Sequence, residues 1–197
     1  MTETDQTPLL ILQNWFSPAF PIGAFSYSSG LETAIHRGDV DGRASLASWL
    51  TISMLHGTAF TDAVFLGAAM ADEDVNDLCL ALCAGAERHR ETTELGAAFT
   101  SVMRQTQAIT LPSGLAYPVA IGMAARQLNL QPQPVLAAFV QAVCMNQISV
   151  AVRTVPIGQI DGQSCLLSLA PVIQQAATRA MATKVDAVGS FAPGADL

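Results

Sequence analysis

Lysine is almost absent from this chain: Lys184 is the only one among 197 residues. A phosphate-binding loop of the form GxxxxGK[ST] needs a lysine directly after a glycine, so nucleotide hydrolysis by that route is excluded. The nine Lys and Arg residues are scattered and the net charge is −7, whereas a nucleic-acid-binding protein carries a basic face. We therefore expect neither nucleic acid nor an anionic membrane surface as a partner.

Recognisable catalytic and metal-binding motifs are lacking as well. The three histidines, His36, His56 and His89, form no HExxH motif, and no GxSxG sequence is present. Cys79 and Cys83 are four residues apart on a predicted helix, so they share a face. A closed structural metal site normally has four ligands, and buried cysteines often pack as small hydrophobic residues. We predict no catalytic residue and no metal site in this chain.

Charged residues are also scarce, at 13% of the chain, while hydrophobic residues make up 51%. Typical domains carry about 25% charged residues. We therefore expect another chain to cover part of the apolar surface, through homo-oligomerisation or a stable partner. The four cysteines are too few for a disulfide framework, and the N-terminal stretch MTETDQTPLL lacks the pattern of a signal peptide. These features predict a cytoplasmic protein.

One segment is long enough and apolar enough to be compared with a membrane span. No charged residue lies between Arg126 and Arg153. The segment contains Pro132, Pro134 and several Asn and Gln residues. Such interruptions favour a helix that is buried in a protein core or in a dimer interface.

The chain shows weak strand signals and recurrent helical spacing of apolar residues. We predict an all-α fold, with residues 1–197 forming one domain, a bundle of about eight helices. A break or a bend is expected within 88–94, with Thr92 or Thr93 as the cap of a new helix, and Pro171 is expected to kink or delay the last helix. The expected helical segments are 7–15, 26–38, 41–71, 75–88, 95–103, 119–129, 135–155 and 164–188, with 111–118 expected to be loop.

Two segments rich in proline and glycine stand out between the expected helices. One is SPAFPIGAFSYSSG at residues 17–30, and the other is AVRTVPIGQIDGQ at residues 151–163, both expected to be largely loop. Proline and glycine are typical of stiff connectors between helices. Surface loops this apolar are also typical of docking sites for other proteins. Both interpretations stay open from the residues alone.

The first segment resembles the signature of the urease accessory protein F (UreF) family, roughly SPALPxGxFSYSxGLExA. Matching positions in this chain are Ser17, Pro18, Ala19, Pro21, Gly23, Phe25, Ser26, Tyr27, Ser28, Gly30, Leu31, Glu32 and Ala34. The second segment resembles the family's AVRLxPLGQxxGQ. Its matching positions are Ala151, Val152, Arg153, Pro156, Gly158, Gln159, Gly162 and Gln163. Arg90, Glu91, Thr92 and Gly96 resemble the family's RETxxxG segment.

This resemblance implies an all-α, dimeric protein that is not an enzyme. Family members act in urease maturation as chaperones for nickel insertion. The implied partners are a D/H-type urease accessory protein, the G-type urease accessory GTPase and the urease apoprotein. The family scaffolds this GTPase and modulates its cycle. The chain is then expected to need no cofactor of its own, because nickel and GTP arrive through the partner GTPase.

The resemblance also assigns residues to partner binding. They are Pro21, Gly23, Phe25, Ser26, Tyr27, Ser28, Gly30, Glu32, Arg153, Pro156, Gly158, Gln159 and Gln163. Family members usually continue into a basic C-terminal tail, whereas this sequence stops at Leu197, so we expect that tail to be missing.

A different class of function is kept as an alternative, namely a small all-α cytosolic enzyme with a buried pocket. Glu32, His36 and Arg153 would supply its polar groups. Glu32 and His36 are four residues apart, so they would share a helix face. An ordinary surface pair explains the same spacing.

Overall fold

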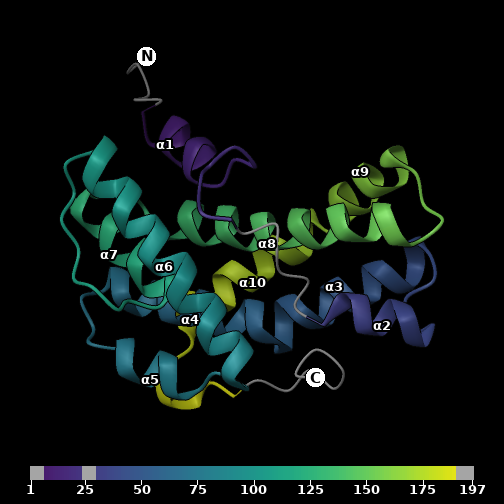
Figure 1. Cartoon of the computed structure of the whole chain (residues 1–197), viewed down its shortest axis with the longest axis horizontal. Helices are drawn as coiled ribbons and strands as arrows, with labels where there is room; N and C mark the ends of the chain where they lie inside the picture. The colour runs from purple at the N-terminus through teal and green to yellow at the C-terminus, as the bar shows by residue number, and fades with distance from the viewer. Residues whose placement is uncertain (1–6, 24–29, 190–197) are drawn as a thin grey trace.

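The computed structural model describes residues 7–23 and 30–189, and these residues confirm the all-α prediction (Figure 1). They contain no strand. The helices are α1 (Thr7–Trp15), α2 (Leu31–Arg37), α3 (Arg43–His56), α4 (Thr58–Met70), α5 (Asn76–Ala81), α6 (Ala86–Thr106), α7 (Tyr117–Gln127), α8 (Pro132–Thr154), α9 (Gln159–Ser168) and α10 (Ala170–Ala182), followed by the 3-10 turn η2 (Val185–Ala187).

Helix α8 lies at the centre of the fold and packs against α1, α2, α3, α4, α9 and α10. It is long and apolar enough to cross a membrane, but half of its most apolar stretch is buried by the other helices. A core helix has the same composition. The sequence predicted that this segment is buried in a protein core or a dimer interface, and the core position is confirmed for half of its most apolar stretch.

More helices are present in the described ranges than the eight predicted, because two expected helices are each divided. The segment 41–71 breaks at Gly57, whose backbone is extended and which lies between α3 and α4. The last helix breaks at Leu169, and Pro171 lies in the first turn of α10. Proline lacks the N–H that a helix interior requires but suits a first turn.

The break predicted within 88–94 is wrong, because α6 is continuous from Ala86 to Thr106. Thr93 does not cap a new helix. Its hydroxyl instead donates within the same helix, to the backbone carbonyls of His89 and Arg90, both at 2.9 Å. A threonine that bonds back to its own helix leaves the helix intact.

The loop predicted for 156–163 is also wrong from Gln159 onward, where α9 begins. Gly158 is the N-cap residue, and its N–H donates to the Asp161 carboxylate at 3.4 Å. This contact satisfies a backbone donor that the start of the helix would otherwise leave unpaired. Gln159 and Gln163 are therefore helical residues.

Aromatic side chains join the N-terminal helix to the bundle. Trp15 and Phe99 meet edge-on with ring centroids 5.3 Å apart, and Phe99 lies 6.1 Å from Tyr117. Phe139 of α8 contacts both Tyr117, at 6.1 Å, and Phe16, at 6.3 Å. Such rings stabilise a fold by the apolar area they bury. They fix the end of α1 and the turn after it over α8.

Helices α4 and α7 approach closely at Gly122. A Cβ atom at this position would lie 2.5 Å from the Leu66 carbonyl oxygen and 2.7 Å from the Ala69 Cβ. Both neighbours belong to the buried face of α4. Any side chain at residue 122 would therefore force the two helices apart.

We predict that Gly122→Ala lowers the free energy of unfolding by about 1–3 kcal/mol, the usual cost of overpacking a core. Gly67→Ala on α4 is the matched control, because its added Cβ would meet only Leu136 Cδ2, at 3.7 Å. In a helix that change stabilises by about 0.5–1 kcal/mol. Urea denaturation of both variants measures the difference, and equal effects would contradict the close approach.

Candidate functional site

The two signature segments meet across α8, although they are far apart in the sequence. A surface groove of about 260 Å³ lies between them. One wall carries Phe16 and Pro18 from the turn after α1, and the other is formed by α9. Figure 1 shows α1 and α9 rising from the same side of α8. The groove residues are Phe16, Pro18, Ala142, Met145, Asn146, Ile148, Ser149, Val152, Gln159, Gly162, Gln163 and Leu166.

Gly162 sets the distance between α9 and the groove floor. It is buried, and a Cβ there would lie 3.0 Å from the Cγ2 atoms of Ile148 and Val152. The absence of a side chain lets α9 lie close against α8. This signature glycine therefore serves helix packing, whereas Gln159 and Gln163 beside it stay exposed.

The structure brings two of the predicted partner-binding residues into the groove, namely Gln159 and Gln163. Arg153 is exposed near the end of α8 and donates to the Ser149 hydroxyl at 3.4 Å. Pro156 and Gly158 are exposed in the connection to α9.

Of the predicted residues of the first signature, Gly30 and Glu32 lie at the start of α2, whereas Pro21 and Gly23 follow the turn after α1. Pro21, Gly23 and Glu32 are exposed, and Gly30 precedes α2 with φ of 79°, a conformation that favours glycine. Phe25, Ser26, Tyr27 and Ser28 lie outside the described residues. The described signature residues that line the groove are Pro18, Val152, Gln159, Gly162 and Gln163.

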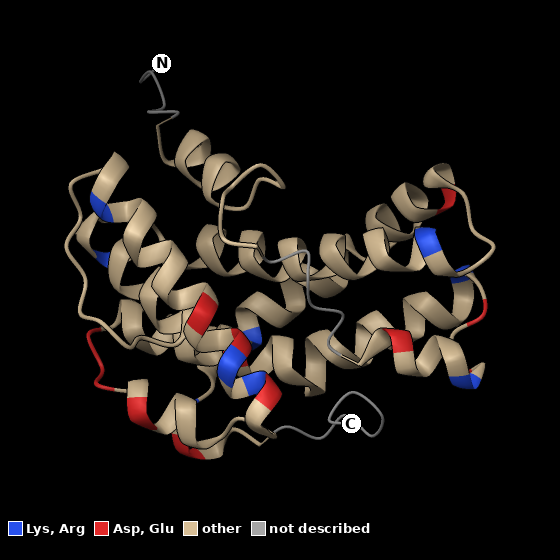
Figure 2. Ribbon diagram, in the orientation of Figure 1, with Lys and Arg blue, Asp and Glu red and all other residues tan. Residues whose placement is uncertain are grey.

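The groove wall contains no Asp, Glu, Lys or Arg among the described residues that line it. Figure 2 shows acidic residues in the turn before α5, on α5 and on α6, among other places. Two large apolar side chains are exposed on α9, Ile160 at 82% and Leu167 at 75%. They are seven residues apart and so lie on the same helix face. Helix α9 thus exposes apolar surface that water solvates poorly.

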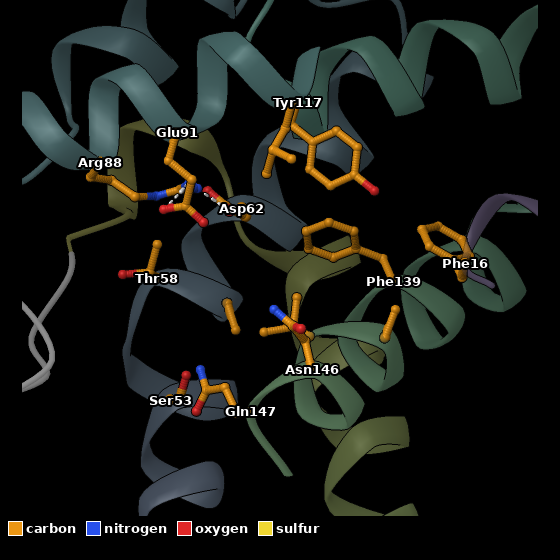
Figure 3. Close-up of a pocket in the computed structure, with 14 residues that line it drawn as sticks. Phe16, Ser53, Thr58, Asp62, Arg88, Glu91, Tyr117, Phe139, Asn146 and Gln147 are labelled. Carbon is orange, nitrogen blue, oxygen red and sulfur yellow. Dashed lines mark hydrogen bonds and ion pairs between the residues drawn. The ribbon is translucent and has the colours of Figure 1, made fainter. Parts of the chain in front are cut away.

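A second pocket of about 100 Å³, called the cavity below, adjoins the groove. Phe16, Ala142 and Asn146 line both spaces and separate them. Figure 3 shows polar side chains from α3, α4, α6 and α8 around this cavity, with Tyr117 and Phe139 on its aromatic side. The residues of this cavity were not predicted from the sequence, because its walls come from several helices whose packing is not encoded locally.

Three charged side chains form a cluster in the cavity wall. Arg88 of α6 pairs with Asp62 of α4, and its second nitrogen pairs with Glu91 at 3.1 Å (Figure 3). All three side chains are less than one-fifth exposed. Burial raises the pKa of the Asp62 and Glu91 carboxyls, although Arg88 opposes this. The two carboxylates raise the pKa of Arg88, even though burial alone would lower it.

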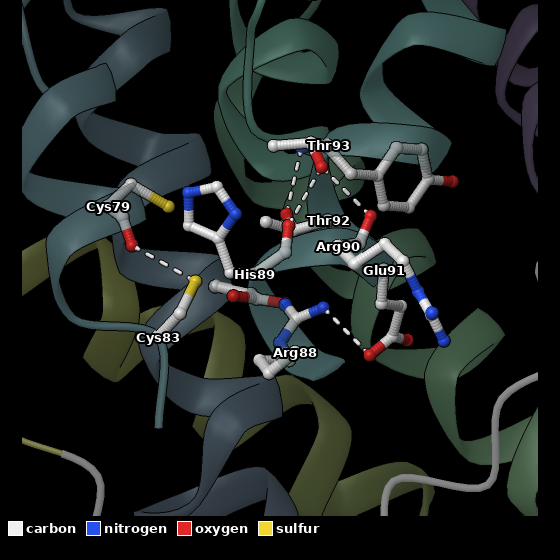
Figure 4. A network of polar contacts seen from close by, with 10 residues as sticks. Cys79, Cys83, Arg88, His89, Arg90, Glu91, Thr92 and Thr93 are labelled. Carbon is white, nitrogen blue, oxygen red and sulfur yellow. Dashed lines mark hydrogen bonds and ion pairs between the residues drawn. The ribbon is translucent and has the colours of Figure 1, made fainter. Parts of the chain in front are cut away.

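The third family-like segment, residues 90–96, lies in the middle of α6 (Figure 4). Glu91 faces the cavity, while exposed Arg90 pairs with Glu94 at 3.9 Å. Thr92 is buried, and its hydroxyl accepts the Tyr117 N–H at 3.1 Å. Gly96 leaves space for the backbone of Leu115, because a Cβ at residue 96 would lie 2.0 Å from the Leu115 carbonyl oxygen. This segment therefore joins α6 to the start of α7.

Cys79 and Cys83 contact each other as one helical turn allows, with the Cys83 thiol donating to the Cys79 carbonyl at 3.6 Å. Cys79 is buried, as expected for a small hydrophobic residue. Burial raises the pKa of both thiols, which disfavours the thiolate that binds metals. In the part of the chain that the structure describes, no three His, Cys, Asp or Glu side chains are grouped to hold a metal ion.

The polar groups of the alternative enzyme are not brought together. Glu32, His36 and Arg153 are all exposed, and none of them lines the groove or the cavity. The constellation proposed for that alternative is therefore wrong. The charged groups that do line the cavity are Asp62, Arg88 and Glu91.

We predict that Thr92→Val lowers the free energy of unfolding by about 1–3 kcal/mol, because the Tyr117 N–H loses its acceptor in a buried place. Thr93→Val is the neighbouring control, since that hydroxyl bonds only to carbonyls of its own helix. It should change stability by less than about 0.5 kcal/mol. Thermal unfolding of both variants measures the change in stability. Equal losses of stability would contradict a special role for the Thr92 hydroxyl.

The sequence of this chain is similar to those of known proteins. A sequence model of the UreF family matches residues 40–170. The chain is 43% identical over 192 residues to the urease accessory protein UreF of Cereibacter sphaeroides, covering 96% of this chain and 91% of the relative. It is 39% identical over 213 residues to the UreF of Bradyrhizobium sp., covering 100% and 89%. The resemblance seen in the signature segments is confirmed, and the chain belongs to the UreF family of urease accessory proteins.

Proposed function

We propose that this protein is a non-catalytic urease maturation factor that works in the cytoplasm. In this proposal it scaffolds the nickel-carrying G-type GTPase and the D/H-type accessory protein on the urease apoprotein, and it modulates the GTPase. It holds no cofactor of its own, and nickel and GTP come with the partner GTPase. The observation that carries the proposal is the uncharged groove in which both signature segments meet.

The groove has the properties of a protein-docking surface. Its walls combine aromatic and aliphatic side chains with the exposed amides of Gln159 and Gln163. Interfaces between proteins are depleted of charge at their centre and carry polar groups that set the register. The names of the relatives, which are urease accessory proteins, support the same role.

A scaffold modulates a GTPase only by binding one of its states more tightly than the other. Coupling free energies of this kind are typically about 1–3 kcal/mol. The groove walls are held by α8 packing and by the Gly162 contact, so they present a preformed surface. A preformed surface loses little entropy on binding, which favours selection of one partner state.

We expect Gln159→Ala and Gln163→Ala to weaken assembly with the G-type GTPase and the D/H-type partner and to lower nickel-dependent urease activation. Both amides line the groove, and an interface residue of this kind typically contributes on the order of 1 kcal/mol. Gln175→Ala on α10 is the control, because Gln175 is exposed and lies outside the groove residues. Size-exclusion chromatography of the mixed components measures assembly, and circular dichroism checks folding.

Wild-type protein that forms no complex with these partners in any nucleotide state would refute the proposed function. Variants that assemble as well as wild type would refute only the groove as the docking site. Lost helicity in the two variants would assign the glutamines to folding instead.

The proposal includes a homodimer, for which the exposed apolar face of α9 is the candidate surface. Ile160 and Leu167 are the two most exposed of the large hydrophobic residues described. Removing such side chains from water stabilises an association by about 25 cal/mol per Å² of buried area. Self-association through this face would cover part of the apolar excess of the sequence.

We expect the double variant Ile160→Gln, Leu167→Gln to shift the protein from dimer to monomer in sedimentation velocity. Met181→Gln is the control, because Met181 is also exposed, at 49%, but lies on α10. It should leave the dimer intact. Wild-type protein that sediments as a monomer at high concentration would contradict the dimer, and a dimer unchanged in the double variant would exclude α9 as its interface.

A further inference from the structure

The charged cluster of Asp62, Arg88 and Glu91 contains one negative charge more than it can pair. Two carboxylates share a single guanidinium, and the side chains are 14%, 19% and 13% exposed. When both carboxyls are ionised the cluster has a net charge of −1 in a place with little water. Burying an unbalanced charge is costly, and proteins usually neutralise it.

The surroundings supply no second cation among the residues that the structure describes. The other titratable groups that face the cluster are Cys79 from α5, Cys83 from the turn after it, Glu87 from α6 and Tyr117 from α7. Burial raises the pKa of both thiols and of the Tyr117 hydroxyl, so they stay neutral between pH 4 and 8. Glu87 adds negative charge. The remaining cavity wall from α3 and α8 is uncharged.

The cluster is also a mechanical link between two helices. Arg88 and Glu91 lie in the first two turns of α6, and Asp62 lies on α4. The Arg88–Asp62 contact is a hydrogen bond that joins α4 to α6 directly. α6 packs mainly on α7, so this contact holds its N-terminal turns against α4.

We propose that this cluster binds one proton, shared between the carboxyl groups of Asp62 and Glu91, and that proton uptake tightens the attachment of α6 to α4. The proton comes from solvent and forms an O–H bond on one carboxylate oxygen. The cluster then holds one guanidinium, one carboxylate and one neutral acid, so its net charge is zero. Because the two carboxyls are coupled, the proton belongs to the pair and not to either residue.

The direction of the pH effect follows from the burial of the carboxyls. Burial raises their pKa in the folded protein above the ordinary value of the unfolded chain. The folded state therefore holds the proton at a pH where the unfolded chain has lost it. The stabilisation is complete below the unfolded pKa and is lost as the pH rises through the folded pKa. For a single proton, the folding equilibrium constant changes by at most about tenfold per pH unit.

The charge count can be tested with three variants and a control. Asp62→Asn and Glu91→Gln each leave one carboxylate on one guanidinium, so the cluster is neutral whenever that carboxyl is ionised. Urea unfolding between pH 5 and 8 should show a smaller pH dependence in both variants than in wild type. The double variant leaves Arg88 without a carboxylate partner, so it should unfold at a lower urea concentration than the single variants at each pH. Glu94→Gln, at an exposed pair on the same helix, should keep the wild-type profile.

Hydrogen exchange in the wild-type protein gives a second measurement that needs no variant to fold. Amides of residues 86–92 should be less protected at pH 8 than at pH 6, after correction for the intrinsic rate, while those of residues 98–104 should change little. A wild-type unfolding profile parallel to that of either single variant overturns the proposal. The proposal is also overturned if the single variants are as unstable as the double variant. It is overturned as well if the protection of amides 86–92 does not depend on pH. The proposal does not depend on the function proposed above.

Discussion

The packing of α8 is the constraint on which the other features depend. Residues 132–154 are predominantly apolar, and neighbouring helices bury half of their most apolar stretch, which removes that surface from water. α1 and α9 both attach to this helix, and their shared support brings the turn at Phe16 and Pro18 next to α9. The groove exists because two segments that are distant in the sequence are held by one floor.

Close approaches of backbone fix the dimensions of this arrangement. Gly162 lets α9 lie against α8, Gly122 lets α7 lie against α4, and Gly96 admits the backbone at Leu115 beside α6. In each place a methyl group would meet atoms of a neighbouring element at 3.0 Å or less. The family-like motifs therefore mix two kinds of residue. Some set the spacing of helices, whereas others, such as Gln159, are exposed where a partner would bind.

The few charged residues of the protein are unevenly distributed, so that its groove and its buried cluster differ in charge. The groove lining lacks charge in the described residues, and acidic side chains lie in the turn before α5, on α5 and on α6, among other places. One charged cluster is buried between α4 and α6, in the wall of a cavity that shares Phe16 with the groove. An uncharged exterior groove suits a protein partner, whereas an unbalanced interior charge responds to protons.

The sequence by itself determined the helical class, the family and the apolar excess, because these follow from composition, spacing and local motifs. It did not predict the break at Gly57, the start of α9 at Gln159 or the pairing of Asp62 with Arg88. Helix ends depend on single capping contacts, which weak local preferences specify poorly. The ion pair and the groove join residues on different helices. Only tertiary packing brings such residues together, because periodicity along one helix carries no information about which helix lies beside it.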